Sequence, residues 1–240
     1  MEVFAHRGAS KQAPENTLVA FELANQYGAN GIELDVHLTK DHVPVIIHDE
    51  NIRRTTNGVG FVQSYTFEEL ASFDAGSWYN PKFNQSKIMS LEQFMEWFVK
   101  KEMKVNMELK TKVIEYPNIE QIVSDYINQY QVNDRTIISS FNPETIQRFR
   151  EVNKRIELAW LTKIRVRRVD LLLEEIGANS IHINQRLLSS RMLKLIIERN
   201  IPFRVYTVNK TSTMKKCEIM GAKSIITDVP DRALQVLQHT

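Results

Sequence analysis

The chain has 240 residues and only one cysteine, Cys217, which excludes an internal disulfide. It lacks any run of 18 apolar residues, so no segment has the pattern of a membrane-spanning helix. No stretch rich in Gly, Pro or Ser interrupts the sequence as a linker would. With hydrophobic residues at 42%, the composition therefore predicts one globular domain with a sizeable core.

The sequence also lacks an excess of charge of either sign. Lys and Arg total 31 against 29 Asp and Glu, so the formal net charge is only +2. This balance predicts neither a nucleic-acid partner nor stable membrane insertion. The densest basic run, 165–168, is interpreted as the solvated start of a helix, with a phosphate-rich surface or an anionic substrate as the alternative. No basic, apolar leader opens the chain, so we expect a cytoplasmic protein.

Short β-branched or apolar runs alternate with amphipathic helical stretches from end to end. The predicted strands are residues 3–5, 31–37, 104–109, 136–140, 157–161, 180–184, 203–208 and 224–227. The predicted helices are residues 17–27, 91–101, 119–130, 143–152, 166–176, 189–199, 212–220 and 231–237. Ser90 with Gln93 is the signature of a capping box that opens the second helix.

Eight strand–helix units in a chain of this length predict an α/β protein with a closed parallel (β/α)8 TIM barrel. An open doubly wound sheet is the alternative. The Gly-rich first turn that is typical of such a sheet is missing from this sequence.

One segment departs from the alternation. The apolar run 43–48 follows the second strand after three residues, too few for a parallel crossover, so it must return antiparallel as a hairpin. Such a hairpin brings His48 back toward the level of Asp35. The stretch that follows, about 49–87, has no helix partner of its own and carries glycines and aromatic residues. We expect it to form a small insertion subdomain over the mouth of the barrel.

Three acidic side chains fall on predicted strands near their ends. Glu33 and Asp35 share parity on the second strand, so both point to one side, and Glu108 lies at the end of the third. In a barrel these ends face the active site. Buried carboxylates are costly unless a cation compensates them. The pattern predicts a site for one divalent cation, Ca²⁺ or Mg²⁺, with ion pairing to a nearby Arg or Lys as the structural alternative.

His6 and His48 end strands beside this predicted cation site. A lone histidine is often only a hydrogen-bonded structural residue, but an imidazole can also give and take a proton near neutral pH. Arg7 and Lys110 flank the same opening, where fixed cations stabilise a phosphate and the added charge of its transition state. Together these groups predict a phosphodiester-cleaving site. The tetrapeptide 14–17 is interpreted as structural support for His6.

With these residues the chain resembles the glycerophosphodiester phosphodiesterase family over nearly its full length. The order and spacing of the matching segments are together highly specific. They are His6-Arg7-Gly8, Pro14-Glu15-Asn16-Thr17, Glu33-Leu34-Asp35-Val36, His48-Asp49, Asp74-Ala75-Gly76-Ser77, Asn106-Met107-Glu108-Leu109-Lys110, Ser139-Ser140-Phe141, Tyr206-Thr207-Val208-Asn209 and Ile226-Thr227-Asp228-Val229-Pro230. The sequence departs from the family at 88–92, where Met-Ser replaces the usual Pro-Thr, and at Tyr206, where Trp is common.

The resemblance implies a barrel with an insertion after the second strand and a metal-dependent enzyme. Such enzymes hydrolyse small-molecule glycerophosphodiesters, for example glycerophosphocholine, to sn-glycerol 3-phosphate and an alcohol. The resemblance implies the acid–base pair His6 and His48, the metal ligands Glu33, Asp35 and Glu108, and the substrate-binding residues Arg7, Lys110 and Tyr206. The head group, the choice between Ca²⁺ and Mg²⁺, the division of acid and base roles, and the attacking group all stay open.

Two other functions are weighed against this one. A lysophospholipid or phospholipid phosphodiesterase acting at a membrane would use aromatic anchors, and the insertion contains Phe61, Phe73, Trp78 and Tyr79, which we interpret as packing residues. A non-catalytic phosphodiester-binding scaffold would be indicated by the loss of a catalytic position, and none is lost. A homodimer is compatible with the exposed helices of a barrel, although no helix face is distinctive enough to assign it.

Overall fold

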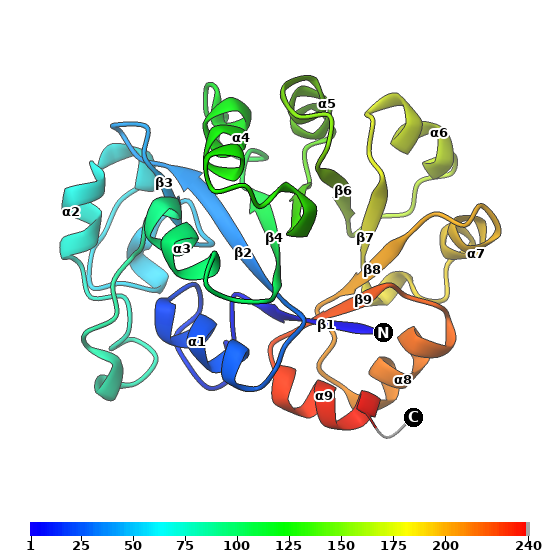
Figure 1. Cartoon of the computed structure of the whole chain (residues 1–240), viewed down its shortest axis with the longest axis horizontal. Helices are drawn as coiled ribbons and strands as arrows, with labels where there is room; N and C mark the ends of the chain where they lie inside the picture. Colours follow the sequence, from blue (N-terminus) through cyan, green and yellow to red (C-terminus); the bar gives the residue numbers. More distant parts are fainter. Residues whose placement is uncertain (239–240) are drawn as a thin grey trace.

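The computed structural model describes residues 1–238 and shows a ring of parallel strands surrounded by helices (Figure 1). Neighbouring strands pair in parallel, and β1 pairs with both β2 and β9, which closes the sheet. The predicted (β/α)8 barrel is thus confirmed. Its strands are β1 (Glu2–His6), β2 (Gly31–Leu38), β4 (Lys104–Leu109), β5 (Thr136–Ser140), β6 (Glu157–Thr162), β7 (Ser180–Asn184), β8 (Phe203–Tyr206) and β9 (Ser224–Thr227).

The outer helices follow the predicted order and lie within three residues of the predicted bounds at each end. Ser90 caps α3 with the expected capping box. The interpretation of the basic run 165–168 as the start of a helix was wrong, because the run lies in the loop before α6. The helices are α1 (Leu18–Gln26), α3 (Leu91–Phe98), α4 (Ile119–Gln129), α5 (Pro143–Val152), α6 (Val169–Glu175), α7 (Arg191–Glu198), α8 (Thr211–Ile219) and α9 (Pro230–Gln238).

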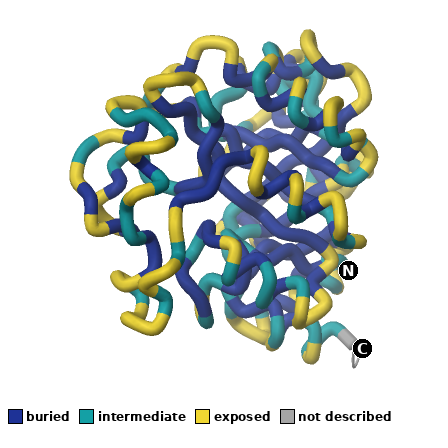
Figure 2. Tube along the Cα trace, turned by 60° about the vertical axis from the view of Figure 1, so that its left-hand side comes forward, coloured by how far each residue is buried: buried dark blue, intermediate teal, exposed yellow. Residues whose placement is uncertain are grey.

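The main hydrophobic core lies between the barrel and its helices. Ile32, Leu34 and Val36 of β2 belong to this core. Since side chains alternate along a strand, Glu33 and Asp35 point to the interior of the barrel instead. Figure 2 shows the same division, with buried strands at the centre and exposed turns at the periphery. The apolar face of β2 thus fixes the direction of its two carboxylates.

The predicted hairpin is present. β3 (Pro44–Ile46) runs antiparallel to β2, with Val36 opposite Ile46. The backbone N–H of Ile47 donates to the carbonyl oxygen of Asp35 at 3.1 Å. His48 therefore returns to the level of Asp35, as the sequence predicted.

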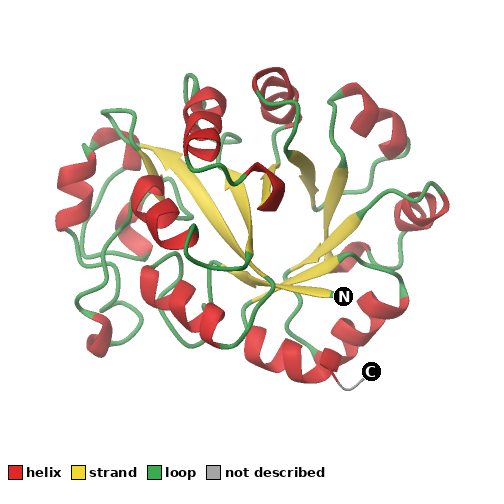
Figure 3. Cartoon of the chain, viewed as in Figure 1, coloured by secondary structure: helices red, strands yellow, loops and turns green. Residues whose placement is uncertain are grey.

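The insertion, residues 49–87, lies beside the barrel as loops and short helices (Figure 3). Its own apolar cluster includes Ile52, Val62 and Leu70. The helices predicted from the sequence do not include α2 (Phe67–Ser72), which forms there. A capping box between Thr66 and Glu69 opens α2 and gives a short helix enough stability to form. The remaining turns are the 3-10 helices η1 (Ile52–Arg54), η2 (Val62–Ser64) and η3 (Pro81–Phe83).

Candidate active site

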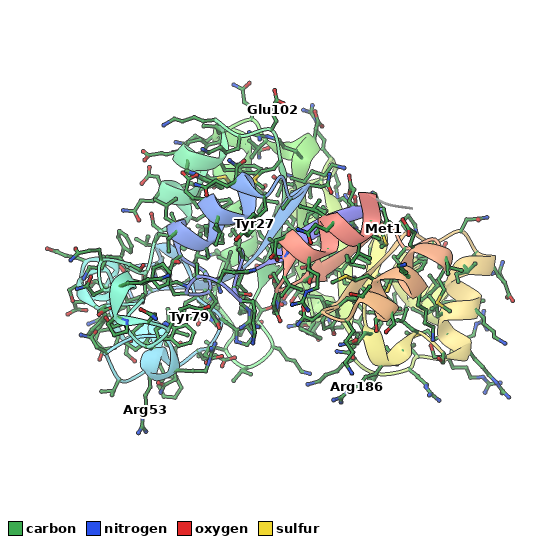
Figure 4. The ribbon with its side chains drawn as sticks, turned by 90° about the horizontal axis from the view of Figure 1, so that it is seen from below. Met1, Tyr27, Arg53, Tyr79, Glu102 and Arg186 are labelled. Carbon is green, nitrogen blue, oxygen red and sulfur yellow. The ribbon has the colours of Figure 1, made fainter. Side chains whose placement is uncertain are left out.

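The carboxyl ends of the strands surround a cavity of about 150 Å³. In Figure 4, Arg53, Tyr79 and Arg186 lie toward the edge of the molecule that carries these strand ends, and Glu102 lies at the opposite edge. The cavity is lined by seven of the eight predicted site residues and by Asn106, Phe141, Leu161, Thr207 and Ile226. The eighth, Asp35, is 1% exposed and lies beneath the others. The fold therefore brings the whole predicted set together from β1, β2, the hairpin, β4 and β8.

The three predicted metal ligands form one acidic cluster. Glu33, Asp35 and Glu108 are buried, and each offers an oxygen within 4.8 Å of the others. Burial and the Asp35 charge raise the pKa of Glu33 to about 8, and burial also raises the pKa of Glu108. Among residues 1–238, the buried Oδ1 of Asp35 has no hydrogen-bond partner. An all-oxygen set with mutual repulsion and a buried oxygen that accepts no hydrogen bond fits a hard divalent cation.

Two cations balance part of this acidic charge. Arg7 Nε lies 3.3 Å from Asp35 Oδ2, and Lys110 Nζ lies 2.8 Å from Glu108 Oε1 and 3.5 Å from Asp35 Oδ1. Although burial opposes it, Arg7 and Lys110 hold the pKa of Asp35 below its usual range. The ion pairs considered as the structural alternative are therefore present. They are compatible with phosphate binding, since both cations reach the cavity.

A tight turn after β1 places His6 and Arg7. Arg7 has a φ of 56° and Gly8 a φ of +82°. A Cβ on Gly8 would lie 2.6 Å from the backbone carbon of Ala20 at the start of α1. Only glycine allows the backbone at position 8 to approach Ala20 so closely, so Gly8 of the His6-Arg7-Gly8 motif is required by the backbone geometry.

The imidazole of His6 is oriented by a carboxylate that the sequence reasoning did not assign. His6 Nδ1 lies 2.6 Å from Asp228 Oδ1, and Asn209 Nδ2 donates to Asp228 Oδ2 at 2.6 Å. Although burial opposes this rise, Glu33 and Asp228 raise the pKa of His6. Burial also acts against a lowered pKa at Asp228, but the hydrogen bond with His6 lowers that pKa to about 2. Because Asp228 follows the last residue of β9, the rule used for the other carboxylates could have found it.

His48 has an equivalent partner. Its Nδ1 lies 2.5 Å from Oδ1 of Asp49, and Arg54 of the insertion donates to the other Asp49 oxygen. Arg54 also donates to both carboxylate oxygens of Glu15, which accepts a hydrogen bond from Arg7 at 2.7 Å. An alternating chain of charges thus joins His48 to Arg7 through the insertion. Only the hairpin and the insertion together bring Arg54 to Glu15, so sequence reasoning missed both residues.

The interpretation of 14–17 as support for His6 was wrong. Glu15 binds Arg7 and Arg54, as described above, and Asn16 Nδ2 donates to Asp35 Oδ2 at 2.9 Å. Thr17 is the N-cap residue of α1, but its Oγ1 donates to the carbonyl oxygen of Pro14 and forms no capping hydrogen bond with the described part of the helix. The tetrapeptide follows a sharp turn that directs it toward Asp35 and the insertion, so it supports Arg7 and the acidic cluster.

The aromatic residues of the insertion pack against the protein. Phe73 contacts the insertion cluster, Trp78 Nε1 donates to the carbonyl oxygen of Ala75, and Tyr79 OH donates to that of Lys11. The packing interpretation is confirmed for Phe73 and Tyr79, whereas Trp78 is 39% exposed. Phe61 is 49% exposed. At the cavity, the ring of Tyr206 meets Phe141 edge to face, with 6.0 Å between centroids.

Comparisons with known proteins identify the family of this chain. The model of the glycerophosphoryl diester phosphodiesterase family matches residues 6–232. The chain belongs to this family. Its enzyme class is accordingly that of the phosphoric diester hydrolases. A glycerophosphodiester phosphodiesterase from Bacillus altitudinis is 37% identical over 241 residues, covering 99% of this chain and 98% of that protein. One from Caldanaerobacter subterraneus is 34% identical and covers 98% and 97%.

A solved structure is similar over the same span. It is an Oleispira antarctica phosphodiesterase in complex with the product sn-glycerol-3-phosphate. The two structures align with a TM-score of 0.92 and 28% sequence identity, covering 99% of this chain and 97% of the other. Among residues 1–238, no helix has both the length and the apolar character that crossing a bilayer requires.

Proposed function

We propose that this member of the family hydrolyses glycerophosphodiesters to sn-glycerol 3-phosphate and an alcohol, with a divalent cation and two histidines. The observation that carries the proposal is a cluster of three buried carboxylates, two of which line one cavity together with two imidazoles. Each imidazole is bound to a carboxylate of its own. The sn-glycerol-3-phosphate bound to the Oleispira antarctica relative supports the identity of the product.

Glu33, Asp35 and Glu108 would hold one divalent cation. When bound, that cation would polarise a nonbridging phosphate oxygen and offset the charge that the phosphate gains during the reaction. Oxygen donors alone suit either Ca²⁺ or Mg²⁺. Arg7 and Lys110, already anchored by these carboxylates, offer N–H donors to the remaining phosphate oxygens.

The two histidines are arranged to transfer protons through Nε2. Ionised Asp228 and Asp49 only accept hydrogen bonds, so Nδ1 of His6 and of His48 must each donate. Each neutral ring then presents an unprotonated Nε2, and each protonated ring presents a proton there. One histidine takes the proton of the attacking group while the other protonates the departing alcohol. The attacking group is water or the neighbouring hydroxyl of the glycerol.

Release of glycerol 3-phosphate from glycerophosphocholine and glycerophosphoglycerol tests the proposal. The protein is stripped of metal and assayed with and without added Ca²⁺ or Mg²⁺, beside Glu108→Gln and the exposed control Lys100→Gln. We expect activity only with metal, loss of about 10²-fold or more in Glu108→Gln with weaker metal binding by calorimetry, and an unaffected control. Full activity of the stripped protein, or no release with either ion, would contradict the proposal.

Three broader expectations remain predictions. We propose that the chain acts as one barrel domain that includes the insertion, is cytoplasmic, and takes a small-molecule substrate as its partner. Cell fractionation tests the location. The sequence also leaves a homodimer open. Light scattering distinguishes it from a monomer, because a single chain has a mass of 27.9 kDa and a dimer has twice that mass.

A further inference from the structure

A second cavity adjoins the catalytic one. It measures about 300 Å³ and shares His48, Glu108, Lys110 and Phe141 with the first cavity. The rest of its lining, which we call the annex, is formed by Glu50, Leu109, Thr111, Lys112, Val113 and Lys163. A phosphodiester has two arms, and the two cavities meet at Lys110, one of the two residues assigned to bind its phosphate. Glu33 and His6 line the first cavity and not the second, so one arm remains for the annex.

We propose that the annex binds the leaving alcohol and selects head groups that carry a second negative charge. This inference rests on the proposed function, because it names the substrate class of that same site. The second charge is that of another phosphate, present either on the head group or as the next phosphodiester of a longer glycerophosphate chain.

The first argument is the charge of the annex. Lys112 follows β4 and Lys163 follows β6, so both belong to loops at the carboxyl ends of the strands. Neither forms an ion pair with a carboxylate among residues 1–238, whereas Lys110 and Glu108 compensate each other. Glu50 is the one remaining acid of the lining. Two uncompensated ammonium groups against one carboxylate favour an anionic ligand.

The basic run in the same loop extends this positive charge. Arg165 and Arg167 are exposed and follow Lys163 within four residues. They form no ion pair with a carboxylate in the described part of the chain. Because the run precedes α6 instead of opening it, its charge lies in a loop on the catalytic side of the barrel. An anionic substrate was one of the two origins considered for this run in the sequence.

The second argument concerns choline-like head groups. A quaternary ammonium is recognised by a cage of several aromatic faces. The cavity that contains the annex has one aromatic ring, Phe141, and Lys112 Nζ already lies 5.8 Å from the centre of that ring. One of the protein's own cations thus already lies near this ring, which makes the annex a poor site for a choline.

A matched set of substrates tests the annex. The probes differ in the charge of the head group. It is neutral in glycerophosphoinositol, anionic in glycerophosphoinositol 4-phosphate and cationic in glycerophosphocholine. We expect kcat/KM for the anionic probe to exceed that for the neutral probe by about 3- to 10-fold at low salt. The ratio falls toward one at high salt because the two lysines are exposed. A glycerol bearing two consecutive phosphodiesters serves as a second anionic probe, and whichever probe is preferred identifies the source of the charge.

Variants assign the preference to the annex. In the double variant Lys112→Gln/Lys163→Gln the anionic-to-neutral ratio falls to about one, whereas Lys100→Gln, which is remote from both cavities, keeps the wild-type ratio. Equal hydrolysis of all probes, or a ratio that survives the double variant, overturns the inference while the proposed function stands. A preference for glycerophosphocholine that Glu50→Gln removes also overturns it and assigns the annex to a cation. If no diester is hydrolysed with either metal ion, it is the proposed function that fails.

Discussion

At the scale of single residues, the site is built from two imidazole–carboxylate pairs that face one cavity from different segments. His6 is paired with Asp228 from the end of β9, and His48 is paired with its own neighbour Asp49. Each carboxylate fixes the tautomer and the orientation of its ring. The catalytic geometry therefore depends on residues that need not touch the substrate.

Asp228→Asn tests this dependence. An amide can donate to Nδ1 and so stabilise the tautomer whose proton is on Nε2, which disables the base. We expect kcat to fall about 10²- to 10⁴-fold with little change in the melting temperature. The exposed substitution Asp125→Asn on α4 is the control. If Asp228→Asn kept its full kcat, His6 would not need this partner.

Two glycines separate two reasons why a backbone position requires glycine, namely a positive φ and close packing against a neighbouring element. Gly8 and Gly28 have φ values of +82° and +80°, but a Cβ would meet Ala20 at Gly8 and nothing within 4 Å at Gly28. We expect Gly28→Ala to lower the free energy of unfolding by about 1 kcal/mol and Gly8→Ala by about 2–4 kcal/mol. Urea unfolding of both variants measures the difference. Equal losses would show that the approach to α1 is easily relieved.

At the scale of elements, capping and alternation account for most of the boundaries. Strands β4, β5, β7 and β9 begin and end where the sequence predicts, and polar residues bound β7 and β9 on both sides. Helix α2 was missed although Thr66 and Glu69 form a capping box, since six residues are too few for a helical period to be recognised. Short elements depend on their caps more than on their periodicity.

Ser90→Ala tests the contribution of a cap. Ser90 accepts a hydrogen bond from the backbone N–H of Gln93, and the Gln93 side chain accepts one from that of Ser90. Removing the hydroxyl should lower the free energy of unfolding by about 1 kcal/mol. Ser212→Ala, an exposed position within the first turn of α8, should change it by less than about 0.5 kcal/mol. Equal effects in denaturant titrations would contradict this role.

At the scale of the whole molecule, the barrel interior is polar at both ends. Below the site, fully buried Arg204 of β8 lies 2.6 Å from Glu157 of β6, which Lys223 also approaches to 3.0 Å. Although burial opposes it, Arg204 lowers the pKa of Glu157 to about 2. This ion pair fills the end of the barrel opposite the acidic cluster and ties strands that are distant in sequence.

Glu157→Gln makes the stability of the barrel less dependent on pH. A carboxyl with a lowered pKa stabilises the fold above its unfolded pKa near 4.5, and this stabilisation is lost as the pH falls toward 2. We expect the variant to be about 2–3 kcal/mol less stable at pH 7, with the deficit shrinking below pH 4.5. Unfolding at pH 3, 4, 5 and 7 measures it, with exposed Glu175→Gln as the control. A deficit that is constant with pH would exclude the ion pair as its cause.

The sequence by itself determined the barrel, the hairpin and the eight residues predicted to form the site. Strand periodicity decides which side chains face inward, and parallel strands place their carboxyl ends on one face, so all of these features except Tyr206 follow from local rules. Only the family resemblance indicated Tyr206. Only the tertiary structure decided which partners orient those residues. Asp228 reaches His6 because the sheet closes between β1 and β9, and Arg54 reaches Glu15 because the insertion folds onto α1's entry turn. Such contacts depend on how distant segments meet, and no local pattern encodes that distance.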